Sequence, residues 1–356
     1  MNNLSNIEKL NQFLLNHYVE KDAKCFTHVE FCPGMGRGRY YISDGEYSIF
    51  FELYRKALED DNNLKIVESP KTLSPLKIDL DFRFGEHYDS HQYIQDDIKN
   101  IIKAYLIEID EYLEIDDSLK KAFIYEIPEP VIDTSGKTHT YKDGIHIMFP
   151  DIVTKPNVQY IIRDKIVSNF DKILDRNKIN YINNASDIVD KAIIKSAGWV
   201  MYGSSKPGRK PYSLTRIYKP STDYENIVDE NICLEEEDIS QYSLEQIISL
   251  SSIHNKDIET SIKEEKINEI NDYGGKKSIK ELNRDKKIYD KKTEDPKVIA
   301  RYLEMLLPFR YNEYNSWLEI GLALYNIGNG SDEYLEIWDN FSQKSDKYEI
   351  GYCSRK

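Results

Sequence analysis

The sequence predicts an α+β fold with mixed sheets, followed by a small all-α module at the carboxyl end. Helical and strand-like periodicities are interspersed without the strict alternation of a doubly wound fold. The 356 residues, 40% hydrophobic and 31% charged, suffice for about two domains. A long charged stretch poor in aromatic residues separates two parts of different character.

Each element of the first part follows from its apolar spacing. Apolar residues recur at helical intervals and predict helices at 5–19, 46–58, 91–114 and 156–174. Runs of apolar, β-branched and aromatic residues predict strands or extended segments at 65–69, 76–84, 122–127, 138–150, 199–204 and 212–218. Between them, a short piece covers 188–194, and Pro207–Gly208 predicts a turn.

The domain boundaries follow from the change in composition. We expect a first domain over 1–250, a charged linker over 251–293 and a helical module over 294–356. Asp295 and Pro296 are typical of the start of a helix. Because the module stops abruptly at Lys356, we expect it to be truncated and the chain to be a fragment of a longer protein.

Composition and charge exclude several classes of protein. No apolar run approaches the ~20 residues that cross a membrane, and the first residues do not form a secretory signal. The cysteines at 25, 32, 233 and 353 show no zinc-ligand spacing, so we expect free thiols. The net charge of −14 argues against a general nucleic-acid binder. Residues 206–219 nevertheless contain five basic residues and no acidic one.

Asp79 and Asp81 are the strongest chemical signal. They lie two apart on a predicted strand, so their carboxylates point to the same side. Like charges held this close repel unless a cation or proton relieves them. Mg²⁺ and Mn²⁺ prefer such oxygen ligands. The alternative is an edge strand with solvated aspartates. By the same alternation, Arg83 should share their side.

Other polar residues further along the chain fit the same kind of site. His146 lies on a strand beside Gly144, and Asp190 could supply a third carboxylate. Small residues followed by basic ones suit contact with phosphate, and here these are Gly203, Ser204, Ser205, Lys206, Arg209 and Lys210. Taken singly, these residues are more often core, cap or turn positions.

Four segments in this order resemble the archaeo-eukaryotic primase superfamily. They are IDLDFR (78–83), DGIHIMF (143–149), IVD (188–190) and YGSSKPGRKPY (202–212). The chain is similar, more narrowly, to the primase region of the primase–helicases of nucleocytoplasmic large DNA viruses. The likeness extends from about residue 25 to 220. Residues 317–348 resemble the primase C-terminal module that follows in such proteins.

The resemblance implies a site. Asp79, Asp81 and Asp190 would be catalytic and hold two divalent ions, Mg²⁺ or Mn²⁺, with no zinc. His146, Lys206, Ser205 and Arg83 would bind the nucleotide, and Arg209 and Lys210 the template or phosphate. One departure is Gly144, where the second motif of the family usually has serine, so a hydroxyl contact is expected to be lost.

The implied function is a DNA primase or primase-polymerase with an archaeo-eukaryotic primase-like catalytic domain. Its partners would be single-stranded DNA, nucleoside triphosphates and a helicase domain in the same parent chain, with no membrane. It would act inside the host cell, in the cytoplasm or nucleus. Two rival functions stay open: a DxD glycosyltransferase using a nucleotide sugar, and a non-catalytic single-strand-binding module of a replication complex.

Overall fold

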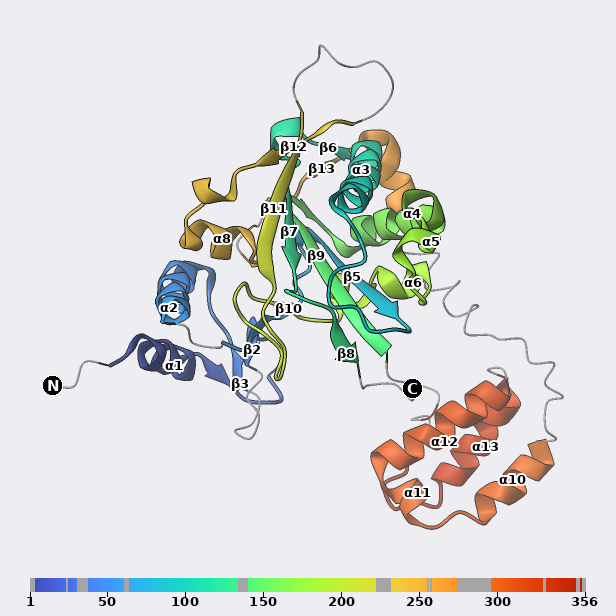
Figure 1. The fold of residues 1–356 in the computed structure, drawn as a ribbon. Coiled ribbons are helices and arrows are strands. Elements are labelled where there is room, and N and C mark those ends of the chain that lie inside the picture. Colours follow the sequence, from blue (N-terminus) through green and yellow to red (C-terminus); the bar gives the residue numbers. More distant parts are fainter. Residues whose placement is uncertain are drawn as a thin grey trace. The chain divides into compact units, whose positions relative to one another are not determined.

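The computed structural model divides the chain into two compact units, Met1–Lys276 and Lys277–Lys356 (Figure 1). The residues it describes are 4–23, 25–30, 38–60, 64–133, 140–221, 232–254, 256, 258–273, 296–328, 331–349 and 353. Among these, no helix has both the length and the apolar character that crossing a bilayer demands.

The first unit mixes helices with three sheets. Its helices include α1 (Asn6–Asn16), α2 (Tyr47–Glu59), α3 (Gln95–Tyr112), α4 (Pro156–Ile173), α5 (Arg176–Ile179), α6 (Ala185–Ile188), α7 (Ala192–Lys195) and α8 (Leu244–Leu250). Its strands are β1 (Tyr18–Val19), β2 (His28–Glu30), β3 (Gly38–Tyr40), β4 (Ile66–Glu68), β5 (Ser74–Phe84), β6 (Leu113–Glu114), β7 (Ala122–Glu126), β8 (Val131–Asp133), β9 (Thr140–Thr154), β10 (Trp199–Val200), β11 (Ser213–Pro220), β12 (Leu234–Glu237) and β13 (Ser261–Ile262).

The largest sheet has six strands in the order β12-β11-β7-β9-β5, with β8 also paired to β9. A five-stranded sheet runs β1-β3-β2-β4-β10. The α+β class is confirmed. Every strand pairing among the described residues is antiparallel, which refines the expected mixed sheets.

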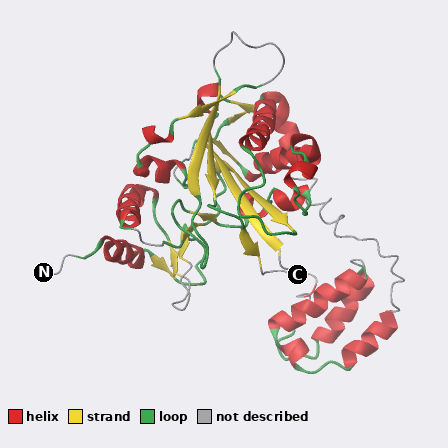
Figure 2. Cartoon of the chain, viewed as in Figure 1, coloured by secondary structure: helices red, strands yellow, loops and turns green. Residues whose placement is uncertain are grey.

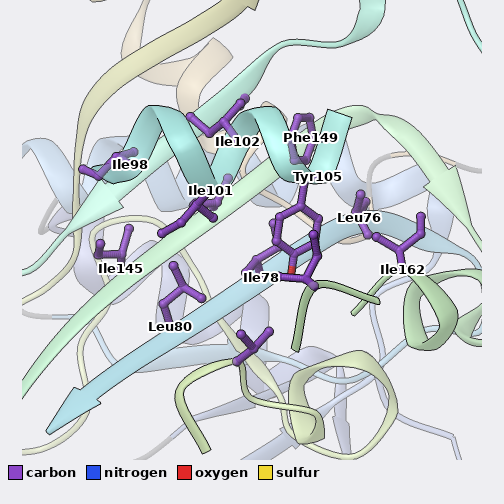
Figure 3. Packing of buried hydrophobic residues seen from close by; sticks show 14 of the residues in the cluster. Leu76, Ile78, Leu80, Ile98, Ile101, Ile102, Tyr105, Ile145, Phe149 and Ile162 are labelled. Atoms are coloured by element: carbon purple, nitrogen blue, oxygen red, sulfur yellow. The ribbon is translucent and has the colours of Figure 1, made fainter. Parts of the chain in front are cut away.

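Helices α3 and α4 cover one face of the six-stranded sheet (Figures 1 and 3). Alternate residues of β5, including Leu76, Ile78 and Leu80, point into this core and are almost fully buried. Figure 3 shows them facing Ile101 and Tyr105 of α3. Because side chains of a strand alternate, the residues between them must point to the opposite face. The apolar face of β5 thereby fixes the direction of Asp79 and Asp81.

The opposite face of the large sheet packs on a second core that includes Trp199 of β10, Ile193 of α7 and Ile247 of α8. Helices α1 and α2 pack on the five-stranded sheet around a separate apolar core. Helix α1 begins where the sequence predicts, with Ser5 and Glu8 exchanging the hydrogen bonds of a capping box.

Residues 251–273 differ from the expectation of a charged linker that starts at 251. Strand β13 pairs with β6, and Ile253 and Ile270 are buried in the first unit. The Ser252 hydroxyl and the Ile253 N–H both donate hydrogen bonds to the Glu68 carboxylate. The first unit therefore continues past 250, because isolated apolar residues in this charged segment find partners in the fold. The rest of the expected linker, 274–293, lies outside the described residues.

Glu68 gives a testable pH dependence of stability. Burial raises the pKa of Glu68 to about 7. The folded state therefore holds the Glu68 proton more tightly than the unfolded chain does. This protonation contributes up to roughly 3 kcal/mol to the free energy of unfolding. The contribution is complete below pH ~4.5 and is lost as the pH rises towards 7. We expect Glu68→Gln to gain unfolding free energy relative to the parent between pH 5 and 8, measured by urea unfolding. An exposed control, Glu20→Gln, should show no such trend. A Glu68→Gln difference that stays constant with pH contradicts this account.

The second unit is helical throughout its described elements (Figure 2). They are α10 (Pro296–Glu304), α11 (Phe309–Asn312), α12 (Tyr314–Ile327) and α13 (Asp332–Ser342). Its core includes Trp317 and Trp338, whose rings stack with centroids 4.6 Å apart. Proline begins the first of these helices, as the sequence predicts.

Candidate active site

Strand β5 places Asp79, Asp81 and Arg83 on the face turned away from the α3 core. The exposures along the strand alternate, and these three side chains are the partly exposed ones near its end. Arg83 shares the side of the two aspartates, as alternation predicts. Its guanidinium forms an ion pair with Asp133 of β8 at 2.5 Å. The arginine is therefore anchored at the rim of the aspartate face.

Strand β9 runs antiparallel to β5 and brings His146, Gly144 and Lys142 opposite Asp79, Asp81 and Arg83. His146 is directly across from Asp79, and Gly144 is across from Asp81. His146 Nε2 lies 3.6 Å from Asp79 Oδ1. Lys142 Nζ lies 2.6 Å from Asp81 Oδ2. The register of this ladder thus joins the first two predicted motifs.

Asp190 reaches the site through its backbone. Its N–H donates a hydrogen bond of 2.9 Å to the carbonyl oxygen of Asp79, and Val189 bridges to Leu80. One oxygen of its carboxylate accepts a hydrogen bond of 2.8 Å from the Ala192 N–H. Within the described ranges, no group of three or more His, Cys, Asp or Glu side chains is arranged as a ready metal site. Asp190 is thus close to Asp79, but its carboxylate does not complete a ligand triad.

Each of the two β5 carboxylates is only partly satisfied by the groups around it. Oδ1 of Asp79 and Oδ1 of Asp81 are buried and make no hydrogen bond. Burial raises the pKa of Asp79 to about 6, with a further rise from Asp190 that Lys142 opposes. Burial, followed by repulsion from Asp79, also raises the pKa of Asp81. Buried carboxylate oxygens without donors are costly unless a cation reaches them. The pair therefore fits a divalent ion such as Mg²⁺ or Mn²⁺.

His146 is held between elements that are distant in the sequence. The centroid of its ring lies 3.7 Å from that of the Tyr212 ring, and the two rings are inclined by 14°. The centroid of the Trp199 ring lies 4.6 Å away. Burial lowers the pKa of His146 to about 3, so the imidazole is neutral at physiological pH. A neutral imidazole donates one hydrogen bond and accepts another.

A pocket of about 470 Å³ opens beside Asp79 and His146. Of the predicted site residues, its walls include Asp79, Arg83, His146, Ser205, Lys206, Arg209 and Lys210. Asp81 and Asp190 adjoin Asp79 without lining the pocket wall. Positive φ angles at Gly203 and Gly208 shape the basic turn. The pocket is thus lined by both carboxylates and cations, and the cations are the more numerous.

Within the turn, Ser205 is buried and its N–H donates to the Leu64 carbonyl, whereas Lys206 and Arg209 are exposed. Lys210 forms an exposed ion pair with Glu129 at 2.7 Å. Such surface pairs contribute little energy and exchange easily for a stronger anion. The volume and charge of the pocket suit a polyanionic ligand of nucleotide size.

Comparison with known proteins identifies the family. Residues 27–218 match the family model described as the C962R protein N-terminal AEP domain, where AEP denotes archaeo-eukaryotic primase. This match spans more than half of the chain. The chain belongs to the AEP superfamily. Residues 299–356 match a second model, Primase C terminal 2 (PriCT-2). Both resemblances predicted from the motifs are confirmed.

The AEP chain also resembles proteins of large DNA viruses. It is 28% identical over 370 residues to "Putative helicase L207/L206" of Acanthamoeba polyphaga mimivirus, a match that covers 98% of this chain and 38% of that protein. It is 27% identical over 359 residues to "Putative helicase 184R" of Invertebrate iridescent virus 6, covering 92% of this chain and 36% of that one. The chain therefore spans little more than a third of the length of these relatives.

Three side chains near the predicted site were given no role from the sequence: Lys142, Trp199 and Tyr212, of which Tyr212 ends the fourth matching segment. Lys142 lies on the same strand face as Gly144 and His146, so alternation along β9 could have indicated it. Trp199 and Tyr212 come from β10 and from the segment just before β11. No local pattern relates them to His146, because only the tertiary fold brings the three rings together.

Proposed function

We propose that the chain is the catalytic region of a DNA primase or primase-polymerase. It would synthesise primers on single-stranded DNA from nucleoside triphosphates. The observation that carries this proposal is the pair of buried, unpaired carboxylate oxygens of Asp79 and Asp81 beside a pocket with cationic walls. Membership of the AEP superfamily supports the same reaction class.

In this reaction the 3′-hydroxyl of a template-bound nucleotide attacks the α-phosphate of an incoming nucleoside triphosphate. A new oxygen–phosphorus bond forms, the bond to the departing pyrophosphate breaks, and the hydroxyl proton passes to solvent. The chemistry needs the two reactants held in line and the phosphate charge neutralised. Both requirements match what the pocket offers.

The residues predicted to form the site each have a role in this proposal. Asp79 and Asp81 would hold Mg²⁺ or Mn²⁺, which supplies charge stabilisation and lowers the pKa of a bound hydroxyl. Asp190 would join them as a third ligand only if its carboxylate turned from the Ala192 N–H towards the ion. Neutral His146 would donate a hydrogen bond to a phosphate oxygen. Lys206 and Ser205 would contact the nucleotide. Arg83 would also contact it, but only at the cost of its ion pair with Asp133. Lys142, which pairs with Asp81, would move to the phosphates when a metal ion replaces it there.

The basic turn that carries Arg209 and Lys210 would contact the template strand. Arg209 is exposed on the pocket wall, and the pair between Lys210 and Glu129 lies at its edge. Phosphate contacts by such side chains give affinity without sequence preference. We therefore propose that Arg209 and Lys210 hold the template backbone.

We further propose that the first domain is followed, after a charged linker, by the PriCT-2 module, and that a helicase lies in the same parent chain. The names and greater length of the viral relatives support this arrangement. The place of action would be the site of viral genome replication, in the host cytoplasm or nucleus.

Primer synthesis with and without template tests the function. The purified chain is incubated with Mg²⁺ or Mn²⁺, labelled nucleotides and each homopolymer DNA in turn. We expect products only with template, and only from the complementary nucleotide. Sugar transfer from a nucleotide sugar without template would instead favour the glycosyltransferase. Single-strand binding that is unaffected by Asp79→Ala, with no incorporation, would favour the binding module.

A further inference from the structure

We propose that Tyr212 is a positioning residue of the nucleotide pocket. Its ring fixes the orientation of His146, and its hydroxyl occupies the space above Gly144 and donates a hydrogen bond to the phosphates of the nucleotide. This inference rests on the proposed function and extends it, because it assigns the phosphate-binding hydroxyl to a residue far from the DxD and histidine motifs.

The first step is the contact between the two rings. Tyr212 and His146 are stacked nearly parallel, with centroids 3.7 Å apart. Trp199 contacts the same imidazole, and its own Nε1–H is anchored on the Ser251 carbonyl at 3.0 Å. Aromatic contacts of this kind restrict the torsions of the enclosed ring. His146 therefore has little freedom to turn away from Asp79.

The second step is the fit between Tyr212 and Gly144. A Cβ atom added to Gly144 would lie 2.2 Å from the tyrosine hydroxyl oxygen and 3.3 Å from its Cζ atom. The first distance is far inside van der Waals contact. Gly144 has no left-handed backbone angle, so glycine is required here by space and not by conformation. The tyrosine hydroxyl takes the place that a side chain on residue 144 would fill.

The third step is the location of that hydroxyl. Residue 144 lies between Lys142 and His146 on the same face of β9, directly across the ladder from Asp81. Tyr212 lines the same pocket as Asp79, Lys142 and Lys206. A serine at 144 would present its hydroxyl to this space, and Tyr212 presents one from a different segment. The hydroxyl contact that Gly144 was expected to lose is thus supplied from elsewhere in the fold.

A size-exchange experiment tests the assignment by nucleotide binding, without turnover. The probe is a nucleoside triphosphate with a methylene bridge between the α- and β-phosphates, titrated calorimetrically with Mg²⁺ against the full chain. We expect Tyr212→Phe to weaken binding about tenfold, the usual loss for one hydrogen bond to a charged group. Gly144→Ala should weaken it at least as much, because the new methyl group displaces the hydroxyl.

The double variants decide the question. Gly144→Ala combined with Tyr212→Phe should bind no worse than Tyr212→Phe alone, since the clashing atom is gone. Gly144→Ser combined with Tyr212→Phe should recover at least half of the lost binding free energy. The imidazole ¹⁵N resonances of His146 should shift in Gly144→Ala and return towards the parent values when Gly144→Ala is combined with Tyr212→Phe.

Matched controls are available in the same chain. An added Cβ at Gly45 meets nothing within 4 Å, so Gly45→Ala should bind normally. Tyr88 packs against Phe84 away from the pocket, so Tyr88→Phe should bind normally too. Additive losses when Gly144→Ala is combined with Tyr212→Phe, or parent-like binding by Tyr212→Phe alone, would overturn the assignment. Intact binding with this coupling but no templated incorporation would instead overturn the proposed function and leave the role of Tyr212 standing.

Discussion

Replacing Asp79 with asparagine is expected to reduce template-directed incorporation by roughly a thousandfold or more. The amide keeps the shape of the side chain but removes the charge that would hold a metal ion. A metal ion contributes several kcal/mol of charge stabilisation to phosphoryl transfer, and every 1.4 kcal/mol is a factor of ten in rate. Initial rates of primer extension on single-stranded DNA, with saturating Mg²⁺, measure the loss.

The same variant should keep its fold. In the parent the buried Oδ1 of Asp79 has no hydrogen-bond donor, so loss of the charge removes an unfavourable burial. We therefore expect the unfolding free energy of Asp79→Asn at pH 8 to equal or exceed that of the parent. Asp187→Asn, an exposed neighbour of the third carboxylate, is the matched control and should retain activity. Full primer yield from Asp79→Asn would refute the assignment of the site.

His146→Ala is expected to lower kcat/KM for the incoming nucleotide by about a hundredfold. The loss combines one hydrogen bond to a charged phosphate with the alignment that the stacked rings provide. His146→Asn, which retains an N–H donor, should recover part of it. Steady-state kinetics at varied nucleotide concentration separate the effects on KM and kcat.

The pH profile adds a second readout for this histidine. Because burial lowers the pKa of His146 to about 3, its protonation should not shape the activity between pH 6 and 8. An activity that falls with a midpoint near 6.5 in the parent, and loses that midpoint in His146→Asn, would contradict a neutral imidazole. The exposed His87 provides the control variant His87→Ala.

The sequence predicted those parts of the site that depend on strand periodicity. Alternation along β5 gave the common side of Asp79, Asp81 and Arg83, because the apolar residues between them must face the α3 core. The same alternation along β9 would have predicted that Lys142 lies on the face of Gly144 and His146. In contrast, the ion pair of Arg83 with Asp133 depends on β8 pairing with β9, which no local pattern specifies.

Long-range contacts account for the rest. The link between Asp190 and Asp79 is a backbone hydrogen bond between segments that are far apart in the chain. The hydroxyl of Tyr212 above Gly144 exists only because a connecting segment folds back over β9. The charged composition of 251–273 also led to the wrong prediction of a linker there. A few apolar residues, such as Ile253 and Ile270, are enough to attach this segment to the first unit because they are buried in its core.

The segment that begins at Ser251 determines where the chain can be shortened. The Ser251 carbonyl accepts the Trp199 N–H, and Ser252 and Ile253 supply the donors for Glu68. A fragment that ends at 250 would leave these groups buried without partners and would loosen Trp199 against His146. None of the described residues that line the pocket lies beyond Tyr212, yet a fragment that keeps the contacts behind Trp199 and His146 must reach at least residue 253.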